Sequence, residues 1–372
     1  MKSYKLITTY LLFVLFSCQN TSDDEQKVKL PKNRLSKKDI TLKIGDTATL
    51  QVIKANPTLD ISLFKIIPKN ESNITVLKNE NGYIKFVSEE EGSNVIYLVD
   101  ETKIIDSCKV YLAKPNLIKV LAIGNSFSED AVEFYLHDLL KEKKQDILIA
   151  NAMIPACNLS THINNLQNNL PFYSYRKINI FGEKKTIENQ TLSTIINNEE
   201  WDYISFQQAS PESGLVETFV TNLPSLYNQT YAINLNKNTK YLLHETWAYA
   251  PTSNHPGFVN YNRNQITMYN GIINSYMKAM KMIPATKIIP SGTAIQNART
   301  STLGNDLTRD GFHLNLTIGR YIVAGAWYEG LTGRSIFRNN YLPSGISTND
   351  LLLSKKAIHY ATVAPFKTTN IN

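Results

Sequence analysis

A serine, a histidine and an aspartate have the side chains that nucleophilic attack on an acyl group uses. Ser126 lies in "VLAIGNSFSEDA" (120–131), where an apolar, strand-like run gives way to an amphipathic helix. A serine at such a junction is either a helix cap or a nucleophile, and a nucleophile needs a base that a third group orients. His313 is the candidate base, and Asp310 in "LTRDGFHLNLTIGR" is the candidate orienting carboxylate.

The elements that must position these residues alternate between strand and helix from residue 117 onward. Strands are expected at 118–123, 146–154, 201–207, 239–247 and 286–290, and helices at 129–143, 192–200, 217–235, 264–282 and 315–331. This order predicts an α/β fold with a parallel sheet covered on both faces. Ligands bind beyond the carboxyl ends of such strands, so a serine after the first strand and a histidine before the last helix can meet there.

The preceding segment, 35–113, has a different pattern. "ITLKIGDTATLQVI" (40–53) alternates apolar and polar residues around Gly45-Asp46, and "NGYIKFVSEEEGSNVIYLVD" (81–100) repeats the alternation. Short alternating strands separated by turn residues predict a small all-β sandwich, joined to the α/β segment by a linker at 114–117.

The first residues have the pattern of an export signal. Two lysines precede an apolar run at 6–16 that is too short to span a bilayer, which favours a signal peptide. "LFSC" (15–18) resembles the lipobox of bacterial lipoproteins, which implies a signal peptide at 1–17, lipid on Cys18 and a tether at 18–34. The alternative is an ordinary signal with an incidental cysteine. We expect a membrane-anchored outer-membrane lipoprotein, exposed on the cell surface.

The net charge and the spacing of Cys and His residues argue against nucleic-acid binding and metal binding. The formal charge of +7 falls to +5 without residues 1–17, which hold two lysines and no acids. There is no Lys/Arg stripe with interleaved aromatics, so no nucleic-acid partner is expected. No Cys/His cluster has metal-ligand spacing, and we expect neither a metal nor another cofactor.

Several motifs together resemble one superfamily. "GNSFS" (124–128) and "DGFH" (310–313) resemble the Gly-Asp-Ser-(Leu/Phe) first block and the Asp-x-x-His last block of SGNH, or GDSL-type, hydrolases. "WDYISFQQAS" (201–210), "ETWAYA" (245–250) and "IPSGTAIQNARTS" (289–301) resemble an uncharacterised branch of that superfamily. The resemblance implies a three-layer α/β/α, flavodoxin-like domain over 117–366.

The same resemblance implies the roles in the site. Ser126 would be the nucleophile, His313 the base and Asp310 its orienting partner. The second block, "IPACNLSTH" (154–162), has Pro155-Ala156 where two glycines are usual, so the Ala156 N–H would be one oxyanion donor. The usual Gly-x-Asn-Asp third block is missing, and Gln207 or Gln208 is the candidate side-chain donor.

Two further residues carry open alternatives. His162 either contacts substrate or is a structural hydrogen bonder. Trp247 either stacks on a sugar or packs beneath the site. In the all-β segment, the Leu-x-x-Gly-Asp-x-x-x-Leu pattern at 42–50 resembles the bacterial Ig-like group 2 domain, which implies a spacer or adhesion module.

These observations favour a secreted serine esterase, and the resemblance implies removal of O-acetyl groups from an acetylated polysaccharide or oligosaccharide. The alternative is a non-catalytic glycan-binding or adhesion lipoprotein on a hydrolase scaffold. A lipid or thioester substrate is a third hypothesis, but no long apolar lid segment supports it. Paired carboxylates for glycoside hydrolysis are not evident.

Overall fold

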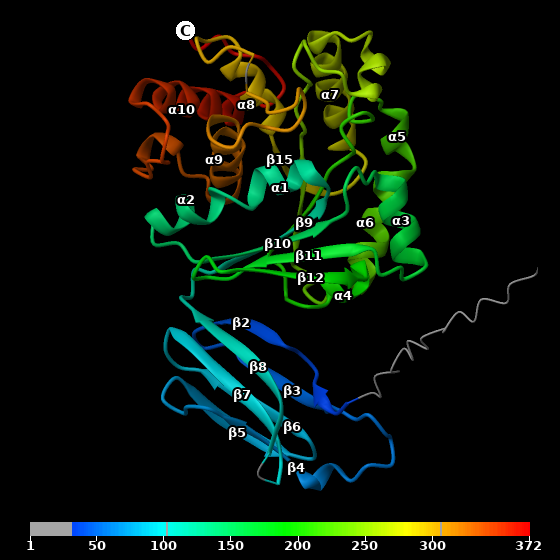
Figure 1. Ribbon diagram of the computed structural model, residues 1–372, viewed down its shortest axis with the longest axis vertical. Helices are drawn as coiled ribbons and strands as arrows, with labels where there is room; N and C mark the ends of the chain where they lie inside the picture. Colours follow the sequence, from blue (N-terminus) through cyan, green and yellow to red (C-terminus); the bar gives the residue numbers. More distant parts are fainter. Residues whose placement is uncertain (1–31, 102, 306) are drawn as a thin grey trace, which may run out of the picture.

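The computed structural model describes residues 32–101, 103–305 and 307–372 (Figure 1). These residues bury two separate hydrophobic clusters, one in the all-β part and one in the α/β part. The predicted signal peptide (1–17), Cys18 and most of the tether (18–34) lie outside the described residues. None of the helices in the described ranges is both long enough and apolar enough to cross a membrane.

The all-β part consists of two four-stranded sheets. One has the order β1 (Arg34–Leu35), β3 (Thr47–Ile53), β6 (Tyr83–Ser88), β5 (Ile74–Glu80), and the other β2 (Asp39–Lys43), β8 (Lys103–Ala113), β7 (Gly92–Asp100), β4 (Phe64–Pro68). Residues of both sheets, such as Leu50 and Val110, share one core. Gly45, at φ +88°, makes the turn between β2 and β3. Similarity to the Ig-like group stays a prediction.

The α/β part is built on a seven-stranded sheet. Its order is β12 (Lys184–Gln190), β11 (Tyr173–Ile178), β10 (Ile147–Met153), β9 (Ile118–Gly124), β13 (Tyr203–Phe206), β14 (Lys240–His244), β15 (Ala285–Ile289). The five strands from β10 to β15 run parallel, which confirms a mixed α/β fold with a large, mostly parallel sheet. Two further strands were not predicted: β11 and β12 form an antiparallel hairpin at one edge of the sheet.

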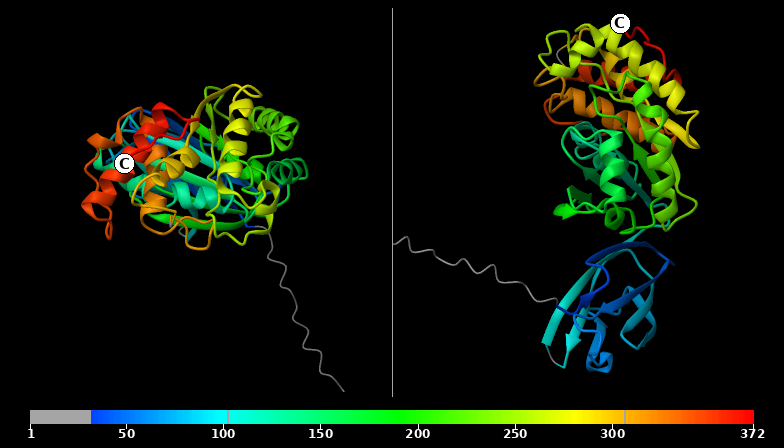
Figure 2. Two further views of the ribbon diagram at one scale, coloured as in Figure 1. Left: turned by 90° about the horizontal axis from the view of Figure 1, so that it is seen from above. Right: turned by 90° about the vertical axis from the view of Figure 1, so that its right-hand side faces the viewer.

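Two groups of helices flank this sheet (Figures 1 and 2). One group consists of α1 (Ser126–Val132), α2 (Leu136–Glu142), α8 (Ser291–Ala298), α9 (Ile318–Thr332) and α10 (Thr348–Val363). The other consists of α3 (Leu159–Gln167), α4 (Leu192–Ile196), α5 (Glu217–Val220), α6 (Asn222–Ile233) and α7 (Gln265–Ala279). Within the described residues there are also three short 3₁₀ helices: η1 (Ile61–Leu63), η2 (Pro256–Tyr261) and η3 (Ile336–Arg338).

The first helix differs from the expectation. The predicted helix at 129–143 is two helices, α1 and α2, separated at Glu133. The Glu133 carboxylate turns inward and accepts a 2.6 Å hydrogen bond from Asn151 on β10.

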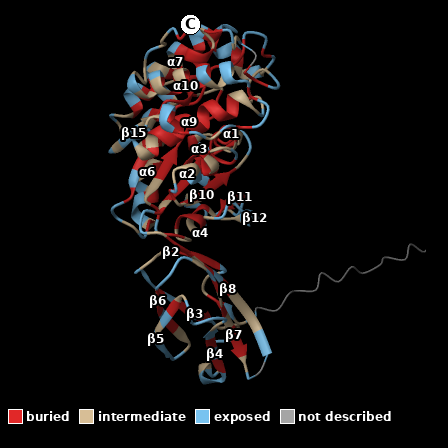
Figure 3. Ribbon diagram, turned by 90° about the vertical axis from the view of Figure 1, so that its left-hand side faces the viewer, coloured by how far each residue is buried: buried red, intermediate tan, exposed pale blue. Residues whose placement is uncertain are grey.

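Helix α9 is buried along most of its length (Figure 3). It packs against α1, the helix that starts at Ser126.

A buried ionic cluster joins the two parts of the chain. Glu199 accepts hydrogen bonds of 2.8 Å from both Lys119 and Lys177, and Lys177 also pairs with Asp39 on β2 at 2.5 Å. Burial raises the pKa of Glu199, but the two lysines outweigh that effect and hold it below its usual value. The all-β part therefore meets the α/β part through fixed, paired charges.

Candidate active site

Ser126 begins α1 at the carboxyl end of β9. Its neighbour Asn125 is the helix cap, because the Asn125 Oδ1 accepts a 2.9 Å hydrogen bond from the Phe127 N–H. The cap role therefore belongs to Asn125, and the Ser126 hydroxyl is available for another partner. As the first helical residue, Ser126 also has a backbone N–H without an acceptor inside the helix.

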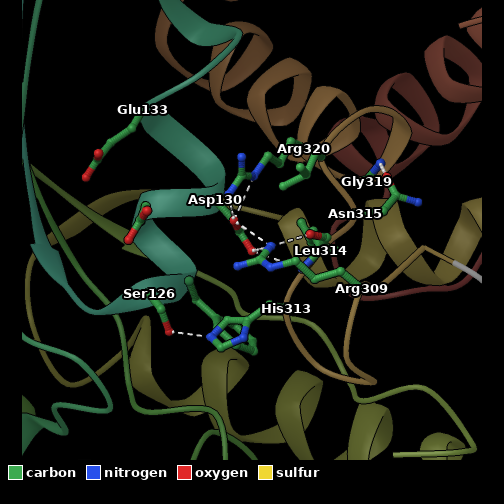
Figure 4. A network of polar contacts seen from close by, with 12 residues as sticks. Ser126, Asp130, Glu133, Arg309, His313, Leu314, Asn315, Gly319 and Arg320 are labelled. Carbon is green, nitrogen blue, oxygen red and sulfur yellow. Dashed lines mark hydrogen bonds and ion pairs between the residues drawn. The ribbon is translucent and has the colours of Figure 1, made fainter. Parts of the chain in front are cut away.

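The structure brings Ser126, His313 and Asp310 into one hydrogen-bonded chain. The Ser126 Oγ lies 2.8 Å from His313 Nε2, a contact that Figure 4 shows, and His313 Nδ1 lies 2.6 Å from Asp310 Oδ2. A carboxylate only accepts, so the imidazole carries its proton on Nδ1 and leaves Nε2 to accept the serine proton. This is the arrangement that activates a serine nucleophile.

Asp310 is held in its ionised form. Partial burial alone raises the pKa of this carboxyl. Hydrogen bonds from the His313 imidazole and from the backbone N–H groups of His313 and Phe312 outweigh that effect, so the pKa lies below its usual value. The backbone contacts also fold the 310–313 turn around its own carboxylate.

Trp247 packs against the nucleophile helix and the 310–313 turn. The Trp247 indole lies parallel to the Phe127 ring, with centroids 4.1 Å apart, and its Nε1 donates a 2.7 Å hydrogen bond to the Phe312 carbonyl. Trp247 is fully buried. The hypothesis that it stacks on a sugar is therefore wrong for this structure, and packing beneath the site is what the tryptophan does.

A cavity of about 210 Å³ opens beside the nucleophile. Its lining consists of Asn125, Ser126, Phe127, Pro155, Ala156, Ser210, Pro211, Phe312 and His313. Sequence reasoning missed Ser210, Pro211 and Phe312 as wall residues. The available signal was position: "QQASP" (207–211) directly follows a predicted strand, and Phe312 lies inside the last block.

Two backbone N–H groups border the cavity as candidate oxyanion donors, those of Ser126 and Ala156. Ala156 is exposed at the rim and has a φ of +54°, in the left-handed region that favours glycine. Glycine would adopt this conformation with less strain, and alanine keeps the backbone N–H. Asn125 Nδ2 holds this loop by donating to the Cys157 carbonyl at 3.0 Å.

Gln207 lies behind the cavity and does not line it. Its Nε2 donates to Asn125 Oδ1 at 2.7 Å, and its Oε1 accepts from His244 Nδ1 at 2.7 Å. Burial lowers the pKa of His244 to about 3, so this imidazole is neutral and its second nitrogen contacts Ser291 at 3.0 Å. The amide that was expected to face the oxyanion instead fixes the helix cap.

Gln208 and His162 are also buried away from the cavity. Gln208 donates to Thr218 Oγ1 at 2.9 Å and accepts from the Leu159 N–H at 3.0 Å. His162 contacts the Tyr173 hydroxyl at 2.8 Å, and burial lowers its pKa to about 3. Gln208 is therefore not the oxyanion donor that was expected, and for His162 the structure favours the structural alternative, because both side chains bond to buried partners outside the cavity.

The buried thiol beside the oxyanion loop is not a second nucleophile. Burial raises the pKa of Cys157 to about 12, so the thiol beside the oxyanion loop is protonated at neutral pH. Across residues 32–372, apart from 102 and 306, no three His, Cys, Asp or Glu side chains come together as a metal site.

Comparisons with known proteins identify a family and a solved structure that this chain is similar to. A family model described as "Domain of unknown function (DUF4886)" matches residues 119–361. A solved DUF4886 family protein from Bacteroides uniformis ATCC 8492 is 47% identical, with 68% of this chain and 98% of that chain covered and a TM-score of 0.67. No curated protein sequence matches.

Two more distant structures are esterases. A carbohydrate acetylesterase from Xanthomonas citri is 10% identical, with 80% of this chain and 74% of that chain covered and a TM-score of 0.43. A catalytic mutant of an acetylxylan esterase from Geobacillus stearothermophilus is 12% identical, with 56% of this chain and 92% of that chain covered and a TM-score of 0.38.

Proposed function

The chain belongs to the DUF4886 family, and we propose that it is a serine ester hydrolase that removes short acyl groups from a carbohydrate. The hydrogen-bonded chain from Ser126 through His313 to Asp310, with contacts of 2.8 and 2.6 Å, carries this proposal.

The residues supply each step of acyl transfer. Ser126 Oγ attacks the ester carbonyl while His313 Nε2 takes its proton, and the Asp310 carboxylate stabilises the imidazolium that forms. The N–H groups of Ser126 and Ala156 bind the oxygen that becomes negative. His313 then protonates the leaving alcohol, activates a water molecule against the acyl-serine, and returns a proton to Ser126 as the acid is released.

The cavity favours a small acyl group. Its volume of about 210 Å³ lies below the roughly 300–1,000 Å³ of pockets that enclose whole drug-sized ligands. Pro155, Pro211 and Phe312 give it apolar walls suited to a methyl group. The rim at Pro155-Ala156 is exposed to solvent, so the alcohol can extend outward and be as large as a polysaccharide chain.

The polysaccharide and the location are further parts of the proposal. We propose that lipid on Cys18 anchors the protein to the outer membrane, at the cell surface, where acetylated glycans are accessible. The all-β segment 35–113 would then separate the hydrolase from the membrane.

The test is hydrolysis of p-nitrophenyl acetate, butyrate and octanoate by residues 19–372, beside the Ser126→Ala variant. We expect turnover that is fastest for acetate and absent in Ser126→Ala. Ser128→Ala is the matched control, since the Ser128 hydroxyl bonds to Asn125 O and Asn151 Oδ1 and does not contact His313. Acetate release from acetylated xylan and other acetylated glycans then identifies the alcohol.

Two outcomes would contradict the proposal. Turnover that persists in Ser126→Ala would move the chemistry elsewhere. No turnover of any ester by the unmodified protein, together with glycan affinity that survives Ser126→Ala, would favour the glycan-binding alternative.

A further inference from the structure

A buried carboxylate lies one helical turn beyond the nucleophile. Asp130 is four residues after Ser126 on α1, so the two side chains lie on the same face of the helix, one above the other. Asp130 is fully buried, although a charged carboxylate is rarely so unless it is well paired. Its partners show what the charge does (Figure 4).

Those partners lie at both ends of the turn that holds the base. Arg309 Nη1 donates to the two Asp130 oxygens at 3.1 and 3.0 Å, and the Leu314 N–H donates to Oδ2 at 2.9 Å. Arg309 and Leu314 immediately flank the 310–313 turn, which contains Asp310 and His313. The carboxylate therefore holds the turn at its first and last attachment points.

A second arginine holds the carboxylate itself. Arg320, on α9, donates to Asp130 Oδ1 through Nε at 2.8 Å and through Nη2 at 2.7 Å. The Arg320 guanidinium lies over the Phe134 ring, 3.5 Å from its centroid, which restricts it further. Asp130 thus links the nucleophile helix, the base-bearing turn and the helix that follows the turn.

The turn is also closed on itself. Thr308 and Leu314 form an isolated antiparallel bridge, and the Arg309 N–H donates to the His313 carbonyl at 2.9 Å. The Arg309 side chain in addition donates to the Leu314 carbonyl. Because the turn is internally closed, a displacement of Arg309 or Leu314 moves the whole turn, and His313 with it, relative to Ser126.

From these contacts we propose that Asp130 is a positioning residue that sets the separation between Ser126 Oγ and His313 Nε2. Asp130 contacts neither side chain and acts through the backbone of Leu314 and the guanidinium of Arg309. The catalytic part of this inference rests on the proposed esterase function. The geometric part, a fixed Ser126–His313 separation, does not.

Asp130→Asn tests the inference with the smallest change. The amide keeps the shape but turns one acceptor oxygen into an NH₂ group that faces donors from the turn or from Arg320. We expect kcat for p-nitrophenyl acetate to fall about 100-fold with KM within about threefold, because misplacement of a reacting group by about 1 Å costs on that order.

Glu329→Gln is the matched control. Glu329 is another buried carboxylate, on α9, and it accepts from the Ile336 N–H at 2.6 Å and contacts His359 at 3.2 Å, away from the site. Both variants should lower the thermal midpoint, but Glu329→Gln should keep kcat within about twofold below that midpoint. Equal losses of kcat in both variants would show a purely structural role and overturn the inference.

Arg309→Met serves as the second variant if Asp130→Asn does not fold. This substitution removes the hydrogen bonds from the Arg309 guanidinium to Asp130 and leaves Asp130 paired with Arg320 and the Leu314 N–H. It should lower kcat by about tenfold. Retention of full kcat in whichever folded variant is measured would overturn the inference.

Crystal structures of the variants separate this inference from the esterase proposal. In Asp130→Asn or Arg309→Met we expect the Ser126 Oγ–His313 Nε2 separation to exceed about 3.5 Å, beyond hydrogen-bonding distance. If the unmodified protein hydrolyses no ester, the esterase proposal fails, and the positioning role of Asp130 is then tested by the Ser126 Oγ–His313 Nε2 distance alone. A longer distance in the variants supports that role, and an unchanged distance of 2.8 Å refutes it.

Discussion

Replacing Asn125 by aspartate should weaken both the fold and the site. Asn125 is buried and uses both ends of its amide. Its Oδ1 accepts from Phe127 N–H at 2.9 Å and from Gln207 at 2.7 Å, while Nδ2 donates to the Cys157 carbonyl at 3.0 Å. Aspartate keeps the accepting end, but its second oxygen would face the Cys157 carbonyl oxygen.

The magnitude follows from these contacts. The lost hydrogen bond costs about 1 kcal/mol, and a buried carbonyl left facing another acceptor adds about 1–3 kcal/mol. The helix N-terminus favours a negative charge by about 0.3–1 kcal/mol and offsets part of this. The net loss in the free energy of unfolding should be about 1–4 kcal/mol at pH 8. We also expect kcat to fall about 10- to 100-fold, because Cys157 adjoins the Ala156 N–H in the oxyanion loop.

The loss should depend on pH. When protonated, the introduced carboxyl group can donate to the Cys157 carbonyl as the amide does, so the folded protein would raise the pKa of this group above its unfolded value of about 3.9. The deficit is therefore smallest near pH 4 and grows as pH rises through the folded pKa. Urea unfolding of Asn125→Asp at pH 5 and pH 8 measures it.

Asn264→Asp is the control for this substitution. Asn264 also caps a helix, with Oδ1 accepting from the Thr267 N–H at 2.9 Å, but it is exposed to solvent. Its free energy of unfolding should change by less than about 0.5 kcal/mol. The reasoning is refuted if Asn125→Asp unfolds and turns over like the unmodified protein at both pH values.

Three other perturbations have defined outcomes. Asp310→Asn should lower kcat by about 10²–10⁴-fold with little change in KM, because the imidazole loses its orienting carboxylate; steady-state kinetics that show an unchanged kcat would contradict the assigned role. Ala156→Gly should raise the free energy of unfolding by about 1 kcal/mol, since a residue at φ +54° is strained unless it is glycine; a loss of stability in urea would contradict this. Burial raises the pKa of Glu245 to about 8, so its contribution to stability is present below pH ~4.5 and is lost, at about 1.4 kcal/mol per pH unit, as pH rises towards 8. Glu245→Gln should therefore flatten this part of the stability profile, and an unchanged slope would show that Glu245 is ionised in the fold.

The reacting residues were predictable from the sequence because their motifs are local. Ser126 follows a strand that is apolar except for Lys119, and the three-residue spacing of Asp310 and His313 fits a turn that folds onto its own carboxylate. The alternation of strand and helix was likewise sufficient to predict the parallel part of the sheet.

The edge of the sheet was not predictable in the same way. The β11–β12 hairpin is rich in lysine and polar residues, and β12 is exposed along most of its length. An edge strand buries little, so it has no continuous apolar run. Helix α8 was missed for a different reason: it is short and all eight of its residues are buried, so its polar residues do not mark a face exposed to solvent.

The side chains around the nucleophile were the least predictable part. The side chains of Gln207, Gln208 and Trp247 bond to partners 82, 49 and 65 positions away in the sequence. His162 lies within α3 and bonds to Tyr173, 11 positions away. Asp130 contacts residues about 180 positions away, so spacing gives no sign of it. These contacts are set by how the layers pack, which a sequence pattern does not specify.

The central claim is that Ser126 is the nucleophile, and covalent labelling tests it most directly. The protein would be mixed with a p-nitrophenyl alkylphosphonate, and the modified peptide identified by mass spectrometry. We predict a single adduct on Ser126, formed at least 100-fold more slowly in His313→Ala. Hydrolysis of p-nitrophenyl acetate that continues with Ser126 unlabelled, or with the adduct on another residue, would contradict the account.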